Sequence, residues 1–405
     1  MTGTATPPIT ITTQPRRVAA LALFLALAFV GTLAFAIASC TGSTNTNTVR
    51  PPVNGTCTDP GGLPAAISCV QEGFTIELVT ATTNIVTRMQ FASDGRLFFS
   101  EKTGTIRVVD AAGNLLGTPF ATITVLGGAE QGLLGLALSP NFAADGHMYV
   151  LASVNDGTDK TQVLRLTDSN ADNVADAQIV LVDNLPVATI ENAGDILFLP
   201  DGTFLVSIGD QNVPANAQDD ASLAGRVLRY RDNNGTVEIP SDNPNGSSDP
   251  EFCRGLRNSF DMCLHVPTGG IYATENGTTS NDELNYLISG KNYGWPSLPM
   301  GFPGAQVGLR IRLWPDVIVP TGIVFHDGTG WGAGFADTLF LCSYGDERVF
   351  RMPMSGIAFT DIDDELLFVE FNLSGPDNKP TAIALHPNGD LYIGTFTGIW
   401  KVSQE

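Results

Sequence analysis

A short pattern that repeats six times constrains the fold of this chain more than any other feature. Each copy has an apolar strand, a tight turn, a second apolar strand and a loop that leads to a third strand. The first copy covers residues 89–100 and turns at Asp94-Gly95, and the last covers residues 381–395 and turns at Asn388-Gly389. Such turns between apolar runs are typical of β-hairpins. The other copies cover residues 136–151, 196–207, 262–274 and 321–343.

Six such units predict an all-β fold, a six-bladed β-propeller of four-stranded antiparallel blades. Each unit exposes an apolar face that only its neighbours can cover, so the ring has to close. Apolar residues alternate with polar ones over residues 74–79, before the first copy, and we expect this segment to complete the last blade as a closing strand. An open β-sandwich is the alternative, but it would not need such regular repetition.

The composition agrees with this interpretation and excludes several classes of protein. The chain has 43 glycines and 25 prolines but only 16% charged residues, which argues against a coiled coil, a helical bundle or a disordered chain. It carries 42 acidic and 21 basic side chains, a net charge of −21. Nucleic acid is therefore not an expected partner, because phosphate binding needs basic patches. Neutral sugars or alcohols are compatible with such a surface.

The first forty residues differ from the rest of the chain. Arg16 and Arg17 precede an uncharged apolar run over residues 18–39, which is long enough for a signal peptide or a membrane-spanning helix. The sequence Ile37-Ala38-Ser39-Cys40 resembles the lipobox of bacterial lipoproteins, in which the cysteine becomes the lipidated N-terminus. An uncleaved signal anchor and a twin-arginine export signal are the alternatives. In each case we expect the body of the protein to lie outside the cytoplasm, in the periplasm or at the cell surface, with a membrane tether only at its N-terminus.

We therefore predict three parts: residues 1–40 as a signal peptide, lipoprotein signal or membrane anchor, residues 41–70 as a flexible linker, and residues 71–405 as the propeller. The linker is rich in Thr, Asn, Pro and Gly and has no periodicity. An oxidising compartment would allow the close cysteine pairs Cys57/Cys69 and Cys253/Cys263 to form disulfides. Cys342 would remain free, and its apolar neighbours predict a packed thiol in a strand.

Several loop motifs resemble the glucose/sorbosone dehydrogenase family. The strongest are Gly255-Leu256-Arg257-Asn258 and the pair Asp282-Glu283 followed by Asn292-Tyr293-Gly294-Trp295-Pro296. Members of that family are soluble quinoproteins that oxidise sugars with pyrroloquinoline quinone (PQQ) and calcium. The resemblance implies a PQQ- and calcium-dependent dehydrogenase that oxidises a sugar or related alcohol and passes the electrons to an external acceptor.

The resemblance also implies catalytic roles for two residues. The family uses a histidine as the base that takes the proton from the sugar hydroxyl, and Glu191 stands at the aligned position of this chain. A carboxylate in a dry pocket can have a pKa high enough for the same task. Arg257 matches the arginine that polarises the quinone carbonyl. The histidines His147, His265, His326 and His386 lie elsewhere, and we expect surface or packing roles for them.

Cofactor and metal ligands follow from the same alignment. Lys379 is the one cation retained at three family positions, because Gly345 and Thr381 occupy the other two. PQQ carries three carboxylates, so its pocket needs cations or strong donors. The implied cofactor-binding residues are Glu130, Gln131, Asn258 and Lys379, and the implied calcium ligands are Gly277, Thr278, Asp282, Glu283 and Tyr293.

Two hypotheses therefore stand. The first is an extracytoplasmic dehydrogenase in which Glu191 replaces the histidine base. The second is a calcium-stabilised propeller without catalysis, which binds a carbohydrate or a protein at the same face. The departures from the family pattern at Glu130, Glu191, Gly345 and Thr381 separate the two hypotheses, whereas Arg257, Asn258 and the calcium motif favour the enzyme.

Overall fold

The computed structural model describes residues 57–58, 63–300, 302–371 and 378–405. The predicted signal or anchor at residues 1–40, including Cys40, lies outside these residues, as does most of the predicted linker. Pro52–Glu405 forms one compact unit. Within the described ranges, no helix is long and apolar enough to cross a membrane.

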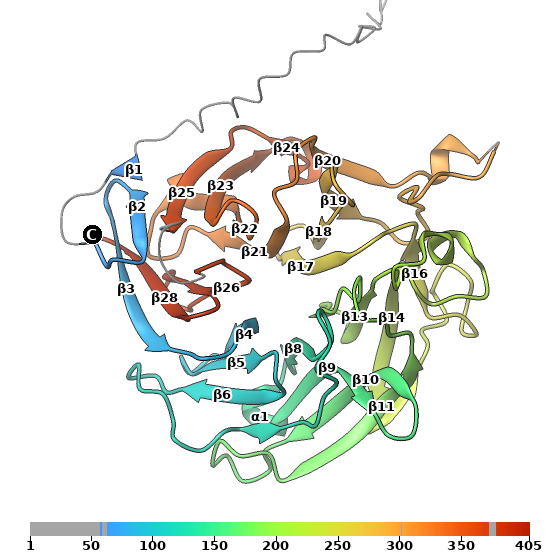
Figure 1. The fold of residues 1–405 in the computed structure, drawn as a ribbon, viewed down its shortest axis with the longest axis horizontal. Coiled ribbons are helices and arrows are strands. Elements are labelled where there is room, and N and C mark those ends of the chain that lie inside the picture. The colour runs from blue at the N-terminus through green and yellow to red at the C-terminus, as the bar shows by residue number, and fades with distance from the viewer. Residues whose placement is uncertain (1–56, 59–62, 301, 372–377) are drawn as a thin grey trace, which may run out of the picture. The chain divides into compact units, whose positions relative to one another are not determined.

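Six antiparallel sheets are arranged around a common centre, which confirms the predicted six-bladed propeller (Figure 1). Blade 1 consists of β4 (Val86–Phe91), β5 (Leu97–Glu101), β6 (Thr105–Val109) and β7 (Ala121–Thr122). Blade 2 consists of β8 (Leu133–Leu138), β9 (His147–Asn155), β10 (Asp159–Thr167) and β11 (Ala177–Leu185). Blade 3 consists of β12 (Ile196–Phe198), β13 (Thr203–Ile208) and β14 (Arg226–Asn233), with β15 (Thr236–Glu238) and β16 (Glu251–Arg254) both paired to β14.

The second half of the ring has the same plan. Blade 4 consists of β17 (Ser259–His265), β18 (Gly270–Glu275), β19 (Asp282–Leu287) and β20 (Leu309–Trp314). Blade 5 consists of β21 (Pro320–Asp327), β22 (Ala336–Ser343), β23 (Arg348–Ser355) and β25 (Leu366–Phe371), and β24 (Asp361–Ile362) pairs with β23. Blade 6 consists of β26 (Ala382–Leu385), β27 (Leu391–Gly394), β28 (Gly398–Gln404) and β3 (Phe74–Ala81). The helices of the described residues are α1 (Phe142–Asp145) and the 3-10 turns Pro214–Gln218, Gly304–Gln306, Ala333–Phe335 and Ile357–Phe359.

The N-terminal strands close the ring and extend one blade. Strand β3 pairs with β28 from Phe74 opposite Gln404 to Ala81 opposite Gly398, which confirms the predicted closing strand. Strands β2 (Ile67–Gln71) and β1 (Cys57–Thr58) continue outward from β25 of blade 5. Part of the segment that we expected to be a linker is therefore paired in a sheet.

One predicted disulfide is wrong. Cys253 and Cys263 are both free and buried, because they lie on β16 and β17, which belong to different blades. Cys342 is free and fully buried in β22, which confirms the packed thiol. Cys69 is disulfide-bonded, and the side chain of its predicted partner, Cys57, lies outside the described side chains.

Apolar side chains between neighbouring blades form the core. Phe74 of β3 contacts the rings of Trp331, Phe335 and Phe368, with centroid distances of 4.7, 5.3 and 5.1 Å. This cluster joins blade 6 to blade 5 at the point where the ring closes. Each buried ring of this size stabilises the fold by about 1.5–3 kcal/mol.

Arg88 ties the inner strands of four blades together. Its Nε lies 3.0 Å from Asp195 Oδ1 and 3.6 Å from Asp261 Oδ1, and all three side chains are nearly inaccessible to solvent. Asp195 accepts a hydrogen bond from the Met262 amide at 3.0 Å, and Asp261 accepts one from the Ile323 amide at 2.9 Å. Burial raises the pKa of Asp261, Arg88 opposes the shift, and the neighbouring Asp195 adds to it.

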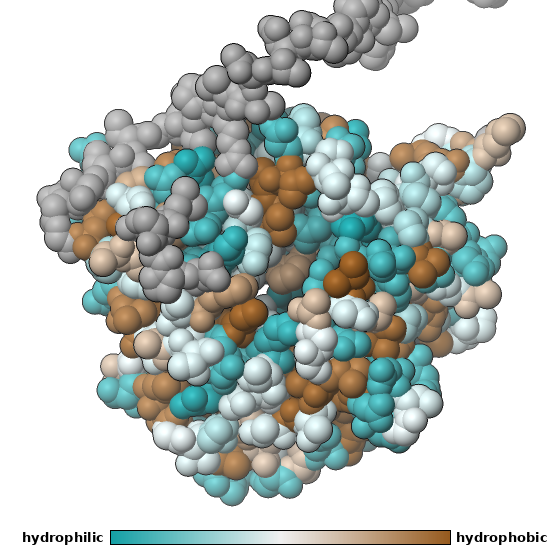
Figure 2. Space-filling model, in the orientation of Figure 1, coloured by the Kyte–Doolittle hydropathy of each residue, from teal (hydrophilic) through white to brown (hydrophobic). Residues whose placement is uncertain are grey.

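Threonine hydroxyls complete this ring of inner-strand contacts. Thr87 donates to the Leu133 carbonyl at 2.8 Å, which joins blade 1 to blade 2. Thr321 donates to the Pro380 carbonyl at 2.9 Å, and Thr381 donates to the Val86 carbonyl at 2.6 Å, so blades 5, 6 and 1 are also joined. The inner strands are therefore fixed around a central opening, and Figure 2 shows the unit hollowed where the blades meet.

Candidate active site

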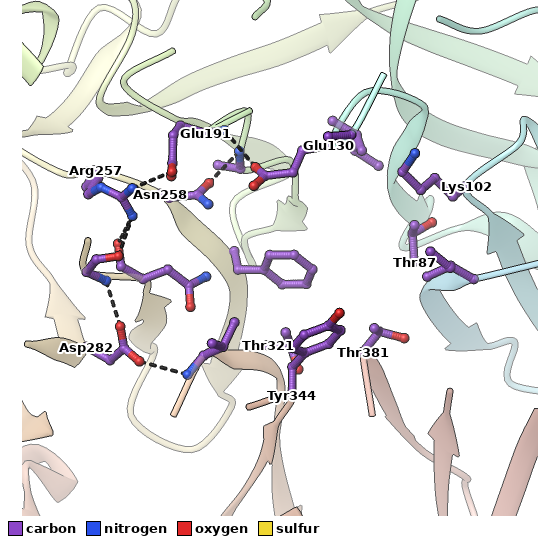
Figure 3. A pocket seen from close by; sticks show the side chains of 18 of the residues that line it. Thr87, Lys102, Glu130, Glu191, Arg257, Asn258, Asp282, Thr321, Tyr344 and Thr381 are labelled. Atoms are coloured by element: carbon purple, nitrogen blue, oxygen red, sulfur yellow. Dashed lines mark hydrogen bonds and ion pairs between the residues drawn. The ribbon is translucent and has the colours of Figure 1, made fainter. Parts of the chain in front are cut away.

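A cavity of about 370 Å³ lies at the centre of the ring, and side chains from all six blades line it (Figure 3). This volume is typical of sites for small molecules and cofactors. The polar and charged residues labelled in Figure 3 are Thr87, Lys102, Glu130, Glu191, Arg257, Asn258, Asp282, Thr321, Tyr344 and Thr381.

The loop before β12 positions Glu191 at the cavity wall. Glu191 has φ +61°, a left-handed conformation that a non-glycine residue adopts only where its surroundings enforce it. Its amide donates to Glu130 Oε2 at 2.7 Å, and its carbonyl accepts from the Gln211 amide at 3.1 Å. A Cβ at Gly209 would lie only 2.1 Å from this carbonyl, so glycine is required there. The side chain of Glu191 is thereby directed towards Arg257.

Glu191 and Arg257 form an ion pair, and their side chains are only 9% and 12% exposed. The other end of the guanidinium donates to the carbonyls of Asn276 and Gly277. The backbone amides of Arg257 and Asn258 both donate to the buried carboxylate of Glu275. Arg257 is thus held at both its backbone and its side chain.

The electrostatic environment of Glu191 suits proton transfer. The pKa of Glu191 is raised to about 7, mainly by burial; the Arg257 charge opposes this shift, and the charges of Glu130 and Asp210 add to it. Its Oε1 contacts Arg257, whereas its Oε2 is buried without a hydrogen-bond partner in the described structure. Asn276 Oδ1 is in the same condition and also lines the cavity. Two buried acceptors of the cavity-lining residues therefore lack a hydrogen-bond donor among the described residues.

The structure brings together four of the residues that the sequence predicted for catalysis and cofactor binding. Asn258 Oδ1 accepts from the Ala193 amide at 2.7 Å and so connects the Arg257 loop to the Glu191 loop. Glu130 faces the same cavity. These contacts place Glu130, Glu191, Arg257 and Asn258 on adjoining loops of one wall (Figure 3).

Two other predicted cofactor residues do not reach the cavity. Gln131 accepts from the Gly128 amide at 3.1 Å within its own loop and is not a lining residue. Lys379 Nζ lies 4.7 Å from the centre of the Tyr344 ring and 3.9 Å from Glu347. It contacts the cavity only through Tyr344, which does line it.

The predicted calcium ligands divide between two cavities. Successive residues of a strand point to opposite faces, and Asp282 and Glu283 begin β19. Asp282 lines the central cavity, where its two oxygens accept from the amides of Gly277, Ile318 and Val319 at 2.7–2.8 Å. Glu283 and Tyr293 line a second cavity, where Glu283 lies 2.7 Å from Arg310. Gly277 and Thr278 line both cavities.

The oxygen donors and cations around the two cavities fit calcium and PQQ, the two groups that the family resemblance implies. Backbone carbonyls, the Asn276 amide oxygen and the Glu283 carboxylate are hard oxygen donors of the kind that calcium prefers. The described residues hold no group of three acidic, histidine or cysteine side chains that could bind a metal, so backbone oxygens would have to supply part of either calcium site. Arg257 and Lys102 place positive charge at the wall of the central cavity, as an anionic cofactor would require.

Sequence analysis missed Lys102, Asn276 and Tyr344. Each is the residue that directly follows the second strand of its blade, β5, β18 or β22, and each lines the central cavity. In the other three blades the residue at this position is Asp156, Gly209 or Thr395, and none of these lines the cavity. The four histidines lie outside the cavity, and His326 stacks on Trp331 at 4.3 Å.

Comparisons with known proteins show which family this chain resembles. A family model described as Glucose / Sorbosone dehydrogenase matches residues 84–395. The aldose sugar dehydrogenase YliI of Escherichia coli is 26% identical over 307 residues, which cover 69% of this chain and 81% of that protein. Quinoprotein glucose dehydrogenase B of Acinetobacter calcoaceticus is 27% identical over 258 residues, which cover 56% of this chain and 53% of that protein. The chain thus spans about half the length of the Acinetobacter relative.

A solved structure and a more distant relative complete the comparison. The PQQ-bound form of aldose sugar dehydrogenase from Streptomyces coelicolor has a TM-score of 0.67 and 24% identity, over 84% of this chain and 99% of that one. The Hedgehog-interacting protein of Homo sapiens is 26% identical over 236 residues, which cover 49% of this chain and 33% of that protein. The proteins to which this chain is similar therefore include some named for a reaction and one named for an interaction.

Proposed function

The chain belongs to the glucose/sorbosone dehydrogenase family, and from this premise we propose that it is an extracytoplasmic, PQQ- and calcium-dependent dehydrogenase that oxidises a sugar or a related alcohol. The observation that carries the proposal is the Glu191 carboxylate in the central cavity. Glu191 as a whole residue is 7% exposed, and its carboxylate Oε2 has no hydrogen-bond partner in the described structure. The pKa of this carboxyl is raised to about 7. A group in this condition is suited to act as a general base near neutral pH.

In this proposal the side chains of one wall divide the work. When bound, PQQ would supply the two-electron acceptor, which an external acceptor would have to reoxidise. Glu191 accepts the proton of the substrate hydroxyl at Oε2, the oxygen that Arg257 leaves free. Arg257 stabilises negative charge next to the Glu191 carboxylate. Asn258 holds the Arg257 loop against the Glu191 loop by accepting a hydrogen bond from the Ala193 amide. The Asn276 Oδ1 acceptor is available for a hydroxyl or N–H group of a ligand.

Calcium is the second part of the proposal. The carbonyls of Gly277 and Thr278 would hold the ion in the central cavity, for which the Gly277 carbonyl would have to release its hydrogen bond from Arg257. Glu283 with the Tyr293 carbonyl would hold a structural ion in the second cavity. The three amides around Asp282 support a role for that residue in shaping the loop between them.

Export and tethering are also proposed. The apolar run at residues 18–39, the lipobox-like Cys40 and the disulfide at Cys69 support a location outside the cytoplasm, because stable disulfides form in oxidising compartments. Replacing Cys40 with Ser in the full chain should release the protein from the membrane fraction if Cys40 carries the lipid. Retention of this variant in the membrane would instead support an uncleaved anchor.

A propeller without catalysis is the second candidate function. The observation that favours it is the Arg257 guanidinium, which is already engaged by Glu191 and two carbonyls. A stable pair of this kind can maintain a binding surface without taking part in a reaction. One relative is also named for a protein interaction.

Binding of PQQ separates the two functions. We would titrate the purified, metal-stripped protein with PQQ by calorimetry, with and without calcium, and then measure turnover of a panel of aldoses with a dye as electron acceptor. Calcium-dependent binding with turnover supports the dehydrogenase, and Glu191→Gln should then lower kcat by about 10²–10⁴-fold while binding persists. Glu238→Gln, at an exposed carboxylate, is the control. Absence of binding at about millimolar PQQ, a free energy of about −4 kcal/mol, would refute the enzyme.

A further inference from the structure

Three cations line the central cavity, and only one of them forms no ion pair with a described carboxylate. Arg88 is bound to Asp195 and to two carbonyls, and Arg257 is bound to Glu191 and to two carbonyls. Lys102 donates to a single described acceptor, the Gly128 carbonyl, at 2.8 Å. An ammonium group has three N–H donors, so two remain for other partners.

The backbone fixes Lys102 in position. Its amide donates to the Ile85 carbonyl at 2.8 Å, and its carbonyl accepts from the Leu133 amide at 3.0 Å. Gly132 packs directly on it with φ +144°, and a Cβ there would lie 2.3 Å from the Lys102 carbonyl oxygen and 2.9 Å from its Cγ. Such a preorganised charge loses little conformational entropy when it binds a ligand.

The position of Lys102 complements that of Arg257. Figure 3 shows Lys102 on the side of the cavity opposite the Glu191–Arg257 pair. Between them, blades 5 and 6 contribute the uncharged side chains of Thr321, Tyr344 and Thr381. Partial burial lowers the pKa of Lys102, while the charge of Glu130 raises it. A charge in this setting is less screened by water and binds an anion more strongly.

We propose that Lys102 is an anion-binding residue of the central cavity, and that its ammonium group binds a carboxylate of the aromatic polycarboxylate cofactor whose other side faces Arg257. This inference rests on the proposed function and extends it. In place of Lys379, which contacts Glu347 and Tyr344, Lys102 of blade 1 is then the lysine that binds the cofactor. The inference also accounts for an unpaired, partly buried ammonium group in a protein of net charge −21.

The test compares four variants by calorimetry in the full protein. Lys102→Met keeps most of the side-chain length without the charge, Lys102→Arg keeps the charge, Lys379→Met removes the cation that the sequence predicted, and Lys401→Met is a control at a lysine paired with Glu77 on another part of the propeller. The probes are PQQ with calcium, and benzene-1,3,5-tricarboxylate without calcium. Thermal unfolding of each variant verifies that it is folded.

The expected result is that Lys102→Met weakens PQQ binding about ten- to a hundredfold, as for a lost charge-assisted hydrogen bond. Lys102→Arg should stay within about threefold of the unmodified protein, and Lys379→Met and Lys401→Met should match it. If the protein binds PQQ and Lys102→Met binds equally well, this inference is overturned while the proposed function stands. If the unmodified protein does not bind PQQ, the proposed function fails. In that case Lys102-dependent binding of the tricarboxylate supports the anion site, and its absence overturns it.

Discussion

Glu191 and Arg257 share one buried ion pair, in which Arg257 uses one end of its guanidinium for the carboxylate and the other for the carbonyls of Asn276 and Gly277. The two residues for which the family resemblance implies separate tasks are therefore electrostatically coupled. A change at either residue alters the charge that the other experiences. This coupling determines how each variant should behave.

The pH dependence of turnover should follow Glu191. Its pKa is raised to about 7 by burial and by Glu130 and Asp210, while Arg257 opposes the shift, so the carboxyl is mostly protonated below that pH. We expect kcat/KM to rise with pH and to level off above about 7, because the ionised form is the base. Glu191→Gln should lower kcat by about 10²–10⁴-fold and remove this dependence. An unchanged pH profile in Glu191→Gln would assign the proton transfer to another group.

The stability of the ion pair can be measured with a double-mutant cycle in urea. Arg257→Gln leaves the Glu191 carboxylate buried without its cation and should cost about 3 kcal/mol of unfolding free energy at pH 8. At pH 5 the loss should be smaller, because Glu191, whose pKa is about 7, is already mostly protonated in the folded protein, so that removing Arg257 leaves no buried negative charge unpaired. Adding Glu191→Gln should restore part of the loss at pH 8. Additive effects of the two substitutions would show that the pair is not coupled.

Arg88 should be more important for folding than for ligand binding. Arg88→Met leaves Asp195 and Asp261 buried together without their cation, so we expect a loss of about 3–5 kcal/mol in unfolding free energy. Lys160→Met, which removes a lysine whose partner Asp156 is largely exposed, is the control and should cost much less than Arg88→Met. Similar losses in the two variants would mean that Arg88 does not hold the inner strands together.

The propeller could be predicted from sequence because its signal is local. Each blade contains hairpins whose turn residues and apolar alternation lie within about twenty residues of one another. The closing strand Phe74–Ala81 was recognisable for the same reason, although it pairs with the opposite end of the chain. The Cys253/Cys263 pairing failed because ten residues of separation do not reveal that a blade boundary lies between them.

The site was predicted only where a motif pointed to it. Glu191, Arg257 and Asn258 lie in recognisable loop motifs, and the structure places them on one wall of the cavity. Lys102 and Tyr344 are far apart in sequence and face one cavity only because the ring closes. The ion pair itself depends on the left-handed backbone at Glu191, which a composition or a repeat does not encode.

Calcium should distinguish Asp282 from Glu283, which point to opposite faces of β19. If Glu283 is a calcium ligand, calcium should raise the melting temperature of the unmodified protein, because an ion that binds only the folded state stabilises it. Glu283→Gln should reduce that increase, because it weakens calcium binding. Asp282→Asn should instead lower the melting temperature equally with and without calcium, because Asn replaces one of the two oxygens that accept the amides of Gly277, Ile318 and Val319 with an NH₂ donor. Differential scanning calorimetry of both variants, each with calcium and with chelator, gives the four melting temperatures to compare. A calcium-dependent loss in Asp282→Asn would mean that its carboxylate binds the ion directly.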